Sequence, residues 1–277
     1  GRQCDNGCGC ERAGQPDRMT NQMTKPGQRV NPVQTVKQGT IYGIGLGPGA
    51  VDLMSVRADR LVRSARHVAF FRKAGKPGHA RQIVADLLPD TAVEFAMEYP
   101  VTTEIPLSDP RYHQILSAFY DECCQHIRAL IQAGEDVIVL CEGDPFFYGS
   151  FMHIYERLRT DCPTEVVPAI TGMSGAWTAT GQPATWGDDI LSVLMGTLPE
   201  SELAARLADT DAAVVMKVGQ NLNKIRRALV TAGRADEAYI AEYATMPRQS
   251  VCRLKDYSAE RAPYFSIIIL HGKGRTP

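Results

Sequence analysis

The chain has 277 residues, of which 44% are hydrophobic, and its 30 basic residues are balanced by 31 acidic ones. This length and composition suffice for the core of one large domain or of two domains of ordinary size. The near-zero net charge excludes a strong field that would attract nucleic acid, and no apolar stretch is long enough to span a bilayer as a helix.

Residues 1–38 differ in composition from the rest of the chain. They are rich in Gln, Asn, Arg, Pro and Gly and contain almost no large apolar side chain, so burial cannot offset the entropy of ordering them. We therefore expect a disordered tail. Cys4, Cys8 and Cys10 lie in this tail, but their spacing matches no zinc or cluster pattern, so no metal site is predicted there.

The remaining cysteines are scattered among apolar patterns, and the chain shows no signal-peptide pattern. Free buried thiols are typical of a reducing compartment, so we expect a cytoplasmic protein. The six histidines include no HxxxH pair, which again predicts no metal site. The cysteines concerned are Cys123, Cys124, Cys141, Cys162 and Cys252.

From residue 39 onward, short runs rich in Val and Ile alternate with amphipathic stretches. Such runs predict strands, because β-branched side chains fit a pleated, half-buried surface. The expected strands cover residues 40–46, 68–71, 136–141, 165–167, 191–195, 213–218, 238–242 and 265–270.

Helical periodicity is found between these runs. It is clearest over residues 112–131, where apolar side chains recur at spacings of three and four and Gly134 follows at the position of a C-cap. A second helix is expected to begin after Ser55, whose hydroxyl is a good N-cap. Its inward-facing residues would be Ala58, Leu61, Val62 and Ala65.

Strands that alternate with helices imply βαβ units and a largely parallel sheet. The stretch over residues 162–175 contains several Pro and Gly residues and predicts a hinge. We therefore expect an α/β fold with an N-terminal domain over residues 39–168 and a C-terminal domain over residues 169–277.

Two glycine-rich loops each follow an apolar strand in the N-terminal half. The first reads GIGLGPGAVDLMS from Gly43, and the second contains Gly143, Asp144 and Pro145 within VIVLCEGDPFFYGSF. A glycine loop at the carboxyl end of a strand lets a ligand lie against backbone where a Cβ would collide. The pair therefore predicts a nucleotide-like ligand.

The commonest alternative is a dinucleotide site, because Gly45, Gly47 and Ala50 satisfy the loose GxGxxG or GxGxxA fingerprint. That fingerprint also requires a helix that opens at the loop and an acidic residue about 20 positions later. Pro48 stiffens the turn, and the positions for the acid read FFRK over residues 70–73. An NADP oxidoreductase that uses Arg72 stays open as an alternative, and no GxxxxGKS or GxxxxGKT phosphate loop occurs.

The motifs taken together resemble those of the tetrapyrrole methylases, which methylate corrinoid and sirohaem precursors with S-adenosylmethionine (SAM). The resemblance runs from Gly39 to about Gly272 and includes GIGLGPGAVDLMS, CEGDPFFYGSF, VVPAITGMSGAW and PYFSIIIL. Within the family, the stretches WGDDILSVLMGTLP, AAVVMKVGQNLNKIR and ATMPRQ resemble the branch that methylates C-20 of precorrin-2 in vitamin B12 synthesis. A cobalt-loaded substrate is the alternative within that branch.

The resemblance implies a cleft between a mainly parallel N-terminal sheet and a mixed C-terminal sheet, with SAM in the cleft and a homodimer as the usual assembly. No metal is implied. The tetrapyrrole would enter an open trough lined by basic residues, for which Arg72, Lys73, Lys76, Arg81, Lys217, Lys224 and Arg248 are candidates. The residues expected to bind the cofactor are Pro48, Glu142, Gly143, Asp144, Thr171, Gly172, Met195, Ala244 and Thr245.

Each of these roles has a structural alternative. Asp144 stands before a proline and could only cap a turn, and Met195 lies in an apolar strand where Met is usually core filler. Tyr148 could be a catalytic phenol or a packed ring, and the general base could be Glu98, Tyr148 or water. Ala169 and Met195 replace the Gly and Pro common at these positions, which leaves a non-catalytic SAM or corrinoid sensor open.

Overall fold

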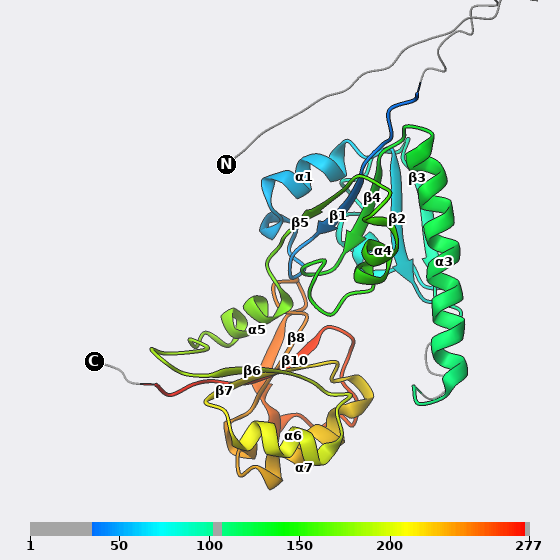
Figure 1. Cartoon of the computed structure of the whole chain (residues 1–277). Coiled ribbons are helices and arrows are strands. Elements are labelled where there is room, and N and C mark those ends of the chain that lie inside the picture. The colour runs from blue at the N-terminus through cyan, green and yellow to red at the C-terminus, as the bar shows by residue number, and fades with distance from the viewer. Residues whose placement is uncertain (1–34, 102–106, 275–277) are drawn as a thin grey trace, which may run out of the picture. The chain divides into compact units, whose positions relative to one another are not determined.

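The computed structural model describes residues 35–101 and 107–274, and in these residues ten strands form two sheets of five strands (Figure 1). The first sheet has the order β3-β2-β4-β1-β5, and every neighbouring pair is parallel. Its strands are β1 (Ile41–Gly45), β2 (His67–Arg72), β3 (Val93–Glu98), β4 (Val137–Cys141) and β5 (Thr164–Val167).

The second sheet has the order β6-β7-β10-β8-β9 and is mixed, because β6 and β7 are parallel and the other neighbouring pairs are antiparallel. Its strands are β6 (Leu191–Met195), β7 (Ala212–Met216), β8 (Tyr239–Glu242), β9 (Ser250–Arg253) and β10 (Ser266–Leu270). The α-helices are α1 (Val56–Arg63), α2 (His79–Ile83), α3 (Pro110–Gln132), α4 (Phe151–Leu158), α5 (Gly172–Thr180), α6 (Glu200–Ala208) and α7 (Leu222–Thr231).

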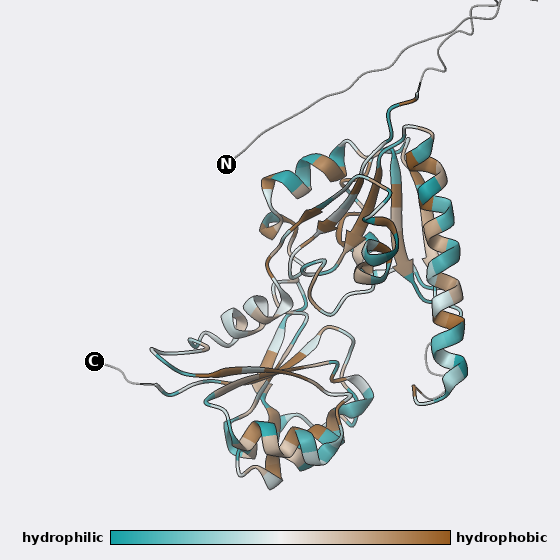
Figure 2. Cartoon of the chain, viewed as in Figure 1, coloured by the Kyte–Doolittle hydropathy of each residue, from teal (hydrophilic) through white to brown (hydrophobic). Residues whose placement is uncertain are grey.

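The first sheet is buried on both faces, as expected for parallel strands. Alternate residues of β4 point to opposite faces. Val137 and Val139 belong to the core formed with α3 and α4, whereas Ile138 and Leu140 belong to the core formed with α1 and α2. Figure 2 shows the same pattern, with mainly hydrophobic strands and helices that carry both hydrophilic and hydrophobic residues.

The second sheet follows the same rule with other helices. Val215 of β7 and Ile268 of β10 pack in the core formed with α6 and α7. Ile269 of β10 and Ala241 of β8 face the opposite side and pack against Ala176 of α5. Helix α5 therefore links the two halves of the chain and covers one face of the second sheet.

Local signals set the helix ends. The hydroxyl of Ser55 accepts a hydrogen bond from the backbone N–H of Ala58 at 3.0 Å, which confirms the expected N-cap. Helix α3 begins after Asp109, whose carboxylate accepts from the N–H of Arg111 at 2.9 Å. The expected stop after this helix is also confirmed, because Gly134 has a φ of +86°.

The α/β fold class, with a parallel first sheet and a mixed second sheet, is confirmed. All eight expected strands are present, but the expectation of a strand to residue 218 is wrong, since β7 ends at Met216. The sequence reasoning missed β3 and β9. Both are edge strands with exposed residues at their ends, so neither carries the apolar run that reveals a central strand.

The predicted tail lies almost wholly outside the described residues, as do Cys4, Cys8 and Cys10. Residues 35–38 are exposed and carry no regular structure. The described residues from Val36 onward group as one compact unit, so the division at residue 168 into two domains stays a prediction. Four of the described cysteines are buried free thiols and Cys252 is partly buried.

Neither a membrane span nor a metal cluster is found within the described ranges. None of the helices there is long and apolar enough to cross a membrane. No group of three His, Cys, Asp or Glu side chains in those ranges is arranged to hold a metal ion.

Candidate functional site

The two glycine-rich loops lie side by side because β1 and β4 are parallel neighbours, so that their carboxyl ends meet at one edge of the sheet. The loops are joined by two backbone hydrogen bonds. The N–H of Gly143 donates to the carbonyl of Gly47 at 2.9 Å, and the N–H of Gly47 donates back at 3.3 Å. The pair therefore forms one rigid backbone surface.

Glycine is required in this surface for two different reasons. Gly47 and Gly143 have φ values of +79° and +60°, which side chains of L-residues rarely allow. A Cβ on Gly45 would lie 2.8 Å from the carbonyl oxygen of Gly143, too close for any real contact. Gly45 thus permits the close approach of the loops, and the other two glycines permit their curvature.

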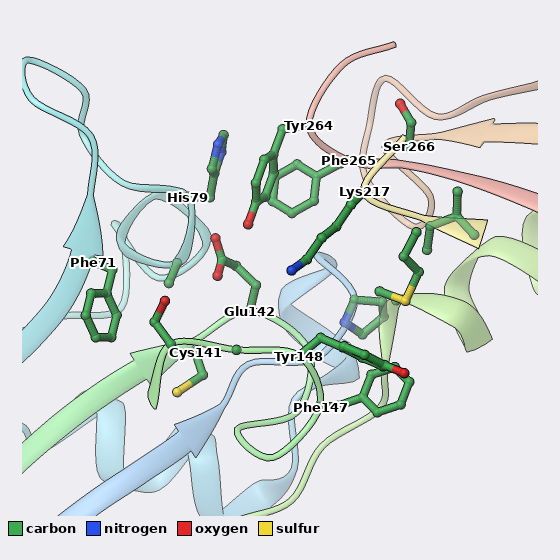
Figure 3. A pocket seen from close by; sticks show the side chains of 18 of the residues that line it. Phe71, His79, Cys141, Glu142, Phe147, Tyr148, Lys217, Tyr264, Phe265 and Ser266 are labelled. Atoms are coloured by element: carbon green, nitrogen blue, oxygen red, sulfur yellow. The ribbon is translucent and has the colours of Figure 1, made fainter. Parts of the chain in front are cut away.

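A cavity of about 890 Å³ opens beyond these loops and is bounded by residues from both sheets (Figure 3). This volume lies within the range of about 300–1,000 Å³ that is usual for small-molecule sites. Eight of the nine predicted cofactor-binding residues line the cavity, namely Pro48, Glu142, Gly143, Asp144, Thr171, Gly172, Met195 and Ala244.

Asp144 anchors the second loop. One carboxylate oxygen accepts from the N–H of Phe146 at 2.9 Å, and the other accepts from the N–H of Ala169 at 2.9 Å. The first bond is the turn cap that the sequence left open as an alternative, and the second ties the loop to the segment before α5. Whether Asp144 also binds a cofactor stays a prediction.

Thr245 is the predicted cofactor residue that does not line the cavity. Its hydroxyl instead accepts from the N–H of Ala50 at 3.0 Å, so it holds the first glycine loop against the segment after β8. Gly175 of α5 packs into the same junction, where a Cβ would lie 3.0 Å from Pro48. The junction therefore fixes the first glycine loop against the second half of the chain.

Strained backbone is concentrated around the cavity. Among the described residues, the non-glycine residues with positive φ are Tyr148, Lys217, Tyr243 and Thr245, at +54°, +53°, +48° and +70°. Tyr148 and Lys217 line the cavity, and the other two flank the lining residue Ala244. Such conformations cost about 1–3 kcal/mol each and persist where the surrounding structure over-determines them, often at functional sites.

The side chain of Glu142 extends into the cavity. In Figure 3 its carboxylate points toward His79 and the hydroxyl of Tyr264, and the ammonium group of Lys217 lies farther to the right. Burial raises the pKa of Glu142 above the ordinary value of a glutamate. The nearby Glu142 charge, and then burial, in turn raise the pKa of the Tyr264 hydroxyl.

An aromatic stack stands at one side of the cavity. The imidazole of His79 lies parallel to the ring of Tyr264, with centroids 4.2 Å apart, and meets Phe265 edge-on at 4.9 Å. Burial, followed by the charges of Lys73 and Arg248, lowers the pKa of His79. The neutral imidazole therefore bridges α2 and the loop before β10.

The two side chains proposed as general bases have different surroundings. Tyr148 lines the cavity and is 47% exposed, and its ring packs edge-on against Phe147 rather than under a helix. Glu98 lies at the end of β3 outside the cavity lining, where its carboxylate pairs with Arg72 at 3.2 Å. The structure therefore does not bring Glu98 together with the predicted cofactor-binding residues, and its contact with the predicted site is the ion pair with Arg72.

Four of the seven basic candidates line the cavity, namely Arg72, Lys73, Lys76 and Lys217. The other three lie outside the lining. Arg81 pairs with Glu94, Lys224 lies near Glu200, and the guanidinium of Arg248 lies 3.7 Å from the centroid of the Tyr243 ring.

Sequence reasoning missed His79, Tyr99 and Tyr264 as cavity residues. Tyr264 stands in the PYFS stretch, which was noted only as part of a motif. His79 follows Gly78, whose positive φ of +84° opens α2, but a lone histidine after glycine gives no specific signal. Only the folded arrangement of distant loops places these rings together.

Comparisons with known proteins show what the chain is similar to. The family model described as Tetrapyrrole (Corrin/Porphyrin) Methylases matches residues 40–257. A Sinorhizobium protein named precorrin-2 C(20)-methyltransferase is 47% identical over 234 residues, which are 84% of this chain and 96% of that protein. A Salmonella typhimurium protein named cobalt-precorrin-2 C(20)-methyltransferase is 28% identical, with the same shares covered.

A solved structure of similar fold is that of uroporphyrin-III C-methyltransferase from Thermus thermophilus in complex with S-adenosylhomocysteine. It covers 84% of this chain and 97% of its own, with 24% identity and a TM-score of 0.60. At this identity the likeness shows the fold alone. It agrees with the pairing of a parallel sheet and a mixed sheet described above.

Proposed function

Because the chain belongs to the tetrapyrrole (corrin/porphyrin) methylase family, we propose that it is a SAM-dependent C-methyltransferase that acts on precorrin-2. It transfers a methyl group to the meso carbon C-20 and yields precorrin-3A in cobalamin biosynthesis. The observation that carries the proposal is the near full-length similarity to the Sinorhizobium precorrin-2 C(20)-methyltransferase. The cavity at the joined glycine loops supports the proposal, because its volume suits a small-molecule ligand.

The residues of the cavity fit SAM. Gly47 and Gly143 present backbone without side chains, and Pro48, Gly172 and Ala244 are small, so a folded nucleoside can lie against the loops. Met195, with Thr171, would form a wall for the adenine. When bound, SAM supplies a sulfonium methyl group that is already activated for transfer.

The chain's own residues then have to align the substrate and exclude water. Precorrin-2 is a polycarboxylate, and Lys73, Lys76 and Lys217 line the same cavity without an ion-pair partner among the described carboxylates. Ammonium groups of this kind bind carboxylates through charge-assisted hydrogen bonds. Arg72 is already paired with Glu98 and is the weaker candidate.

A homodimer and a cytoplasmic location complete the proposal. The homodimer is the usual assembly implied by the family resemblance. The buried free thiols support the reducing compartment.

The proposal is tested in two steps on the purified full chain. Isothermal titration with S-adenosylhomocysteine and with NADP first separates a methyltransferase from an oxidoreductase, and we expect binding of the former only. Incubation with SAM and precorrin-2 then yields a product one methyl group heavier by mass spectrometry.

Each alternative gives a different outcome. Tight binding of S-adenosylhomocysteine without turnover of any tetrapyrrole would indicate a sensor. Turnover of cobalt-precorrin-2 but not of precorrin-2 would assign the enzyme to the cobalt-loaded substrate. The higher identity to the precorrin-2 enzyme leads us to expect faster turnover of the metal-free substrate.

A further inference from the structure

We infer that Glu142 is the general base that removes the C-20 proton after methyl transfer. The inference rests on the proposed function and deepens it, since it assigns a step that neither the family match nor the relatives' names assign. Sequence reasoning placed Glu142 at the cofactor and offered Glu98, Tyr148 or water as the base. The direction and surroundings of the Glu142 side chain favour a different assignment.

The carboxylates of Asp144 and Glu142, two residues apart, differ in their hydrogen bonds. Both carboxylate oxygens of Asp144 accept backbone hydrogen bonds, so that side chain is committed to holding the loop. The carboxylate of Glu142 extends into the cavity (Figure 3), and among the described residues it forms no ion pair within 4.0 Å. Glu142 is thus the carboxylate of this loop that is available to a ligand.

The surroundings of the Glu142 carboxylate also favour a role as a base. The charged and titratable groups that line the cavity around Glu142 come from several elements, namely Cys141, Asp144, Tyr99, Tyr148, His79, Tyr264, Arg72, Lys73, Lys76 and Lys217. None of the basic side chains of the lining pairs with Glu142 within 4.0 Å, and burial disfavours the charge of Glu142 and raises its pKa. A carboxylate made more basic by burial is a better acceptor for a carbon-bound proton.

The other two side chains proposed as the general base, Glu98 and Tyr148, are less suitable. Glu98 lies outside the cavity lining and is neutralised by Arg72. Tyr148 lines the cavity, but in Figure 3 its ring extends away from the Glu142 carboxylate. Of the acidic side chains that the sequence proposed for the site, Glu142 is thus the one whose carboxylate extends freely into the cavity.

The proposed step balances in atoms and charge. The π electrons at C-20 form the new bond to the methyl carbon, and the pair of the breaking S–C bond stays on sulfur. The macrocycle then carries one added positive charge and both H and CH3 on C-20. The Glu142 carboxylate takes that proton, the C–H electron pair returns to the macrocycle, and the resulting carboxylic acid releases its proton to water through the cavity mouth.

Glu142→Gln tests the assignment because it keeps the size of the side chain and removes the basic oxygen. With SAM and precorrin-2 we expect kcat to fall by about 100-fold or more, with KM nearly unchanged. Precorrin-2 that carries deuterium at C-20 should then show a clear primary isotope effect in the variant and little or none in the wild type. A merely structural role would not produce this isotope effect.

Two measurements on the protein without substrate accompany the kinetics. The affinity for S-adenosylhomocysteine, measured by calorimetry, should change by less than about threefold, which corresponds to about 0.7 kcal/mol. In protein whose glutamates are labelled with carbon-13, the carboxyl signal of Glu142 is the one that disappears in Glu142→Gln. In the wild type this signal should titrate with a pKa above the ordinary 4.5 of a glutamate. The matched control is Glu156→Gln on the exposed face of α4, which should leave all these readouts unchanged.

Several results would overturn the assignment. Suppose that the wild type is active. If Glu142→Gln then keeps its kcat, or loses kcat without an isotope effect, Glu142 is not the base. A loss of kcat in Glu98→Gln instead would give the role to Glu98. If S-adenosylhomocysteine binding collapses while kcat at saturation is kept, Glu142 contacts the cofactor. A wild type that does not methylate precorrin-2 refutes the proposed function itself, and the inference falls with it.

Discussion

Glu142 and Asp144 are two positions apart, yet the fold gives their carboxylates different tasks. Asp144 receives two backbone N–H donors, whereas Glu142 extends from the end of β4 into the cavity. The sequence identified both residues from one motif but could not separate their roles. Hydrogen-bond partners such as the N–H of Ala169, 25 residues away, are fixed only by the tertiary fold.

Replacement of Asp144 by Ala should destabilise the protein and impair the site together. Both carboxylate bonds are lost, and each hydrogen bond to a charged group contributes about 1.5–3 kcal/mol. We expect the free energy of unfolding in urea to fall by about 3 kcal/mol and S-adenosylhomocysteine binding to be lost. Asp86→Ala, at an exposed position, is the control. Unchanged stability in Asp144→Ala would show that these bonds contribute little.

Residue positions in the cavity were easier to predict than residue roles. Eight of the nine expected cofactor residues line the cavity, and the glycine loops among them meet there because they follow parallel neighbouring strands. Thr245 was predicted as a ligand residue, and the structure places its hydroxyl on the backbone of Ala50. His79 and Tyr264 were not predicted, since their stacking joins segments that are far apart in the chain.

At the scale of elements, the central strands could be predicted and the edge strands could not. The five residues of β4 are all buried, so the sequence shows a continuous apolar run. The edge strand β3 begins and ends with exposed residues, and its sequence VEFAME gives no such run. Burial on both faces is what makes a parallel strand visible in a sequence.

The joined glycine loops give a prediction with a matched pair of variants. In Gly45→Ala the new Cβ would collide with the Gly143 carbonyl and Ala169, so we expect a loss of about 3 kcal/mol in the free energy of unfolding. In Gly143→Ala the nearest atoms to the Cβ are 3.8 Å away, and the main cost is the left-handed φ, about 1–2 kcal/mol.

Relative to its smaller loss of stability, Gly143→Ala should weaken the binding of S-adenosylhomocysteine more than Gly45→Ala does. The methyl group of Gly143→Ala projects toward Thr171 and Gly172, where the cofactor is expected, and should weaken S-adenosylhomocysteine binding by about tenfold or more. Denaturant unfolding and calorimetry measure the two effects. Full affinity in Gly143→Ala would contradict a ligand lying against this backbone.

At the scale of the whole molecule, three histidines couple the stability of the fold to pH. Burial is the main cause that lowers the pKa of His79, His153 and His271. In the unfolded chain these imidazoles take up protons as the pH falls through about 6.5, whereas in the folded protein they do so at lower pH. The unfolded state therefore binds more protons, and folding stability decreases as the pH falls below about 6.5.

His79→Phe isolates one part of this effect, because a phenyl ring can keep the stack on Tyr264 without titrating. The free energy of unfolding should fall less in the variant than in the wild type between about pH 7.5 and pH 5.5. Urea unfolding at both pH values measures the difference. The exposed His113→Phe is the control, and equal losses in His79→Phe and the wild type would refute the role of His79.

The proposed methyl transfer depends on the whole molecule. Residues from both sheets bound the cavity, and the reaction requires both SAM and the tetrapyrrole. The most direct test supplies SAM with a carbon-13 methyl group and metal-free precorrin-2, and locates the label in the product by NMR. We predict one labelled methyl group bonded to C-20, with S-adenosylhomocysteine formed in equal amount. No label in the macrocycle, or a label on any other carbon, would contradict the account.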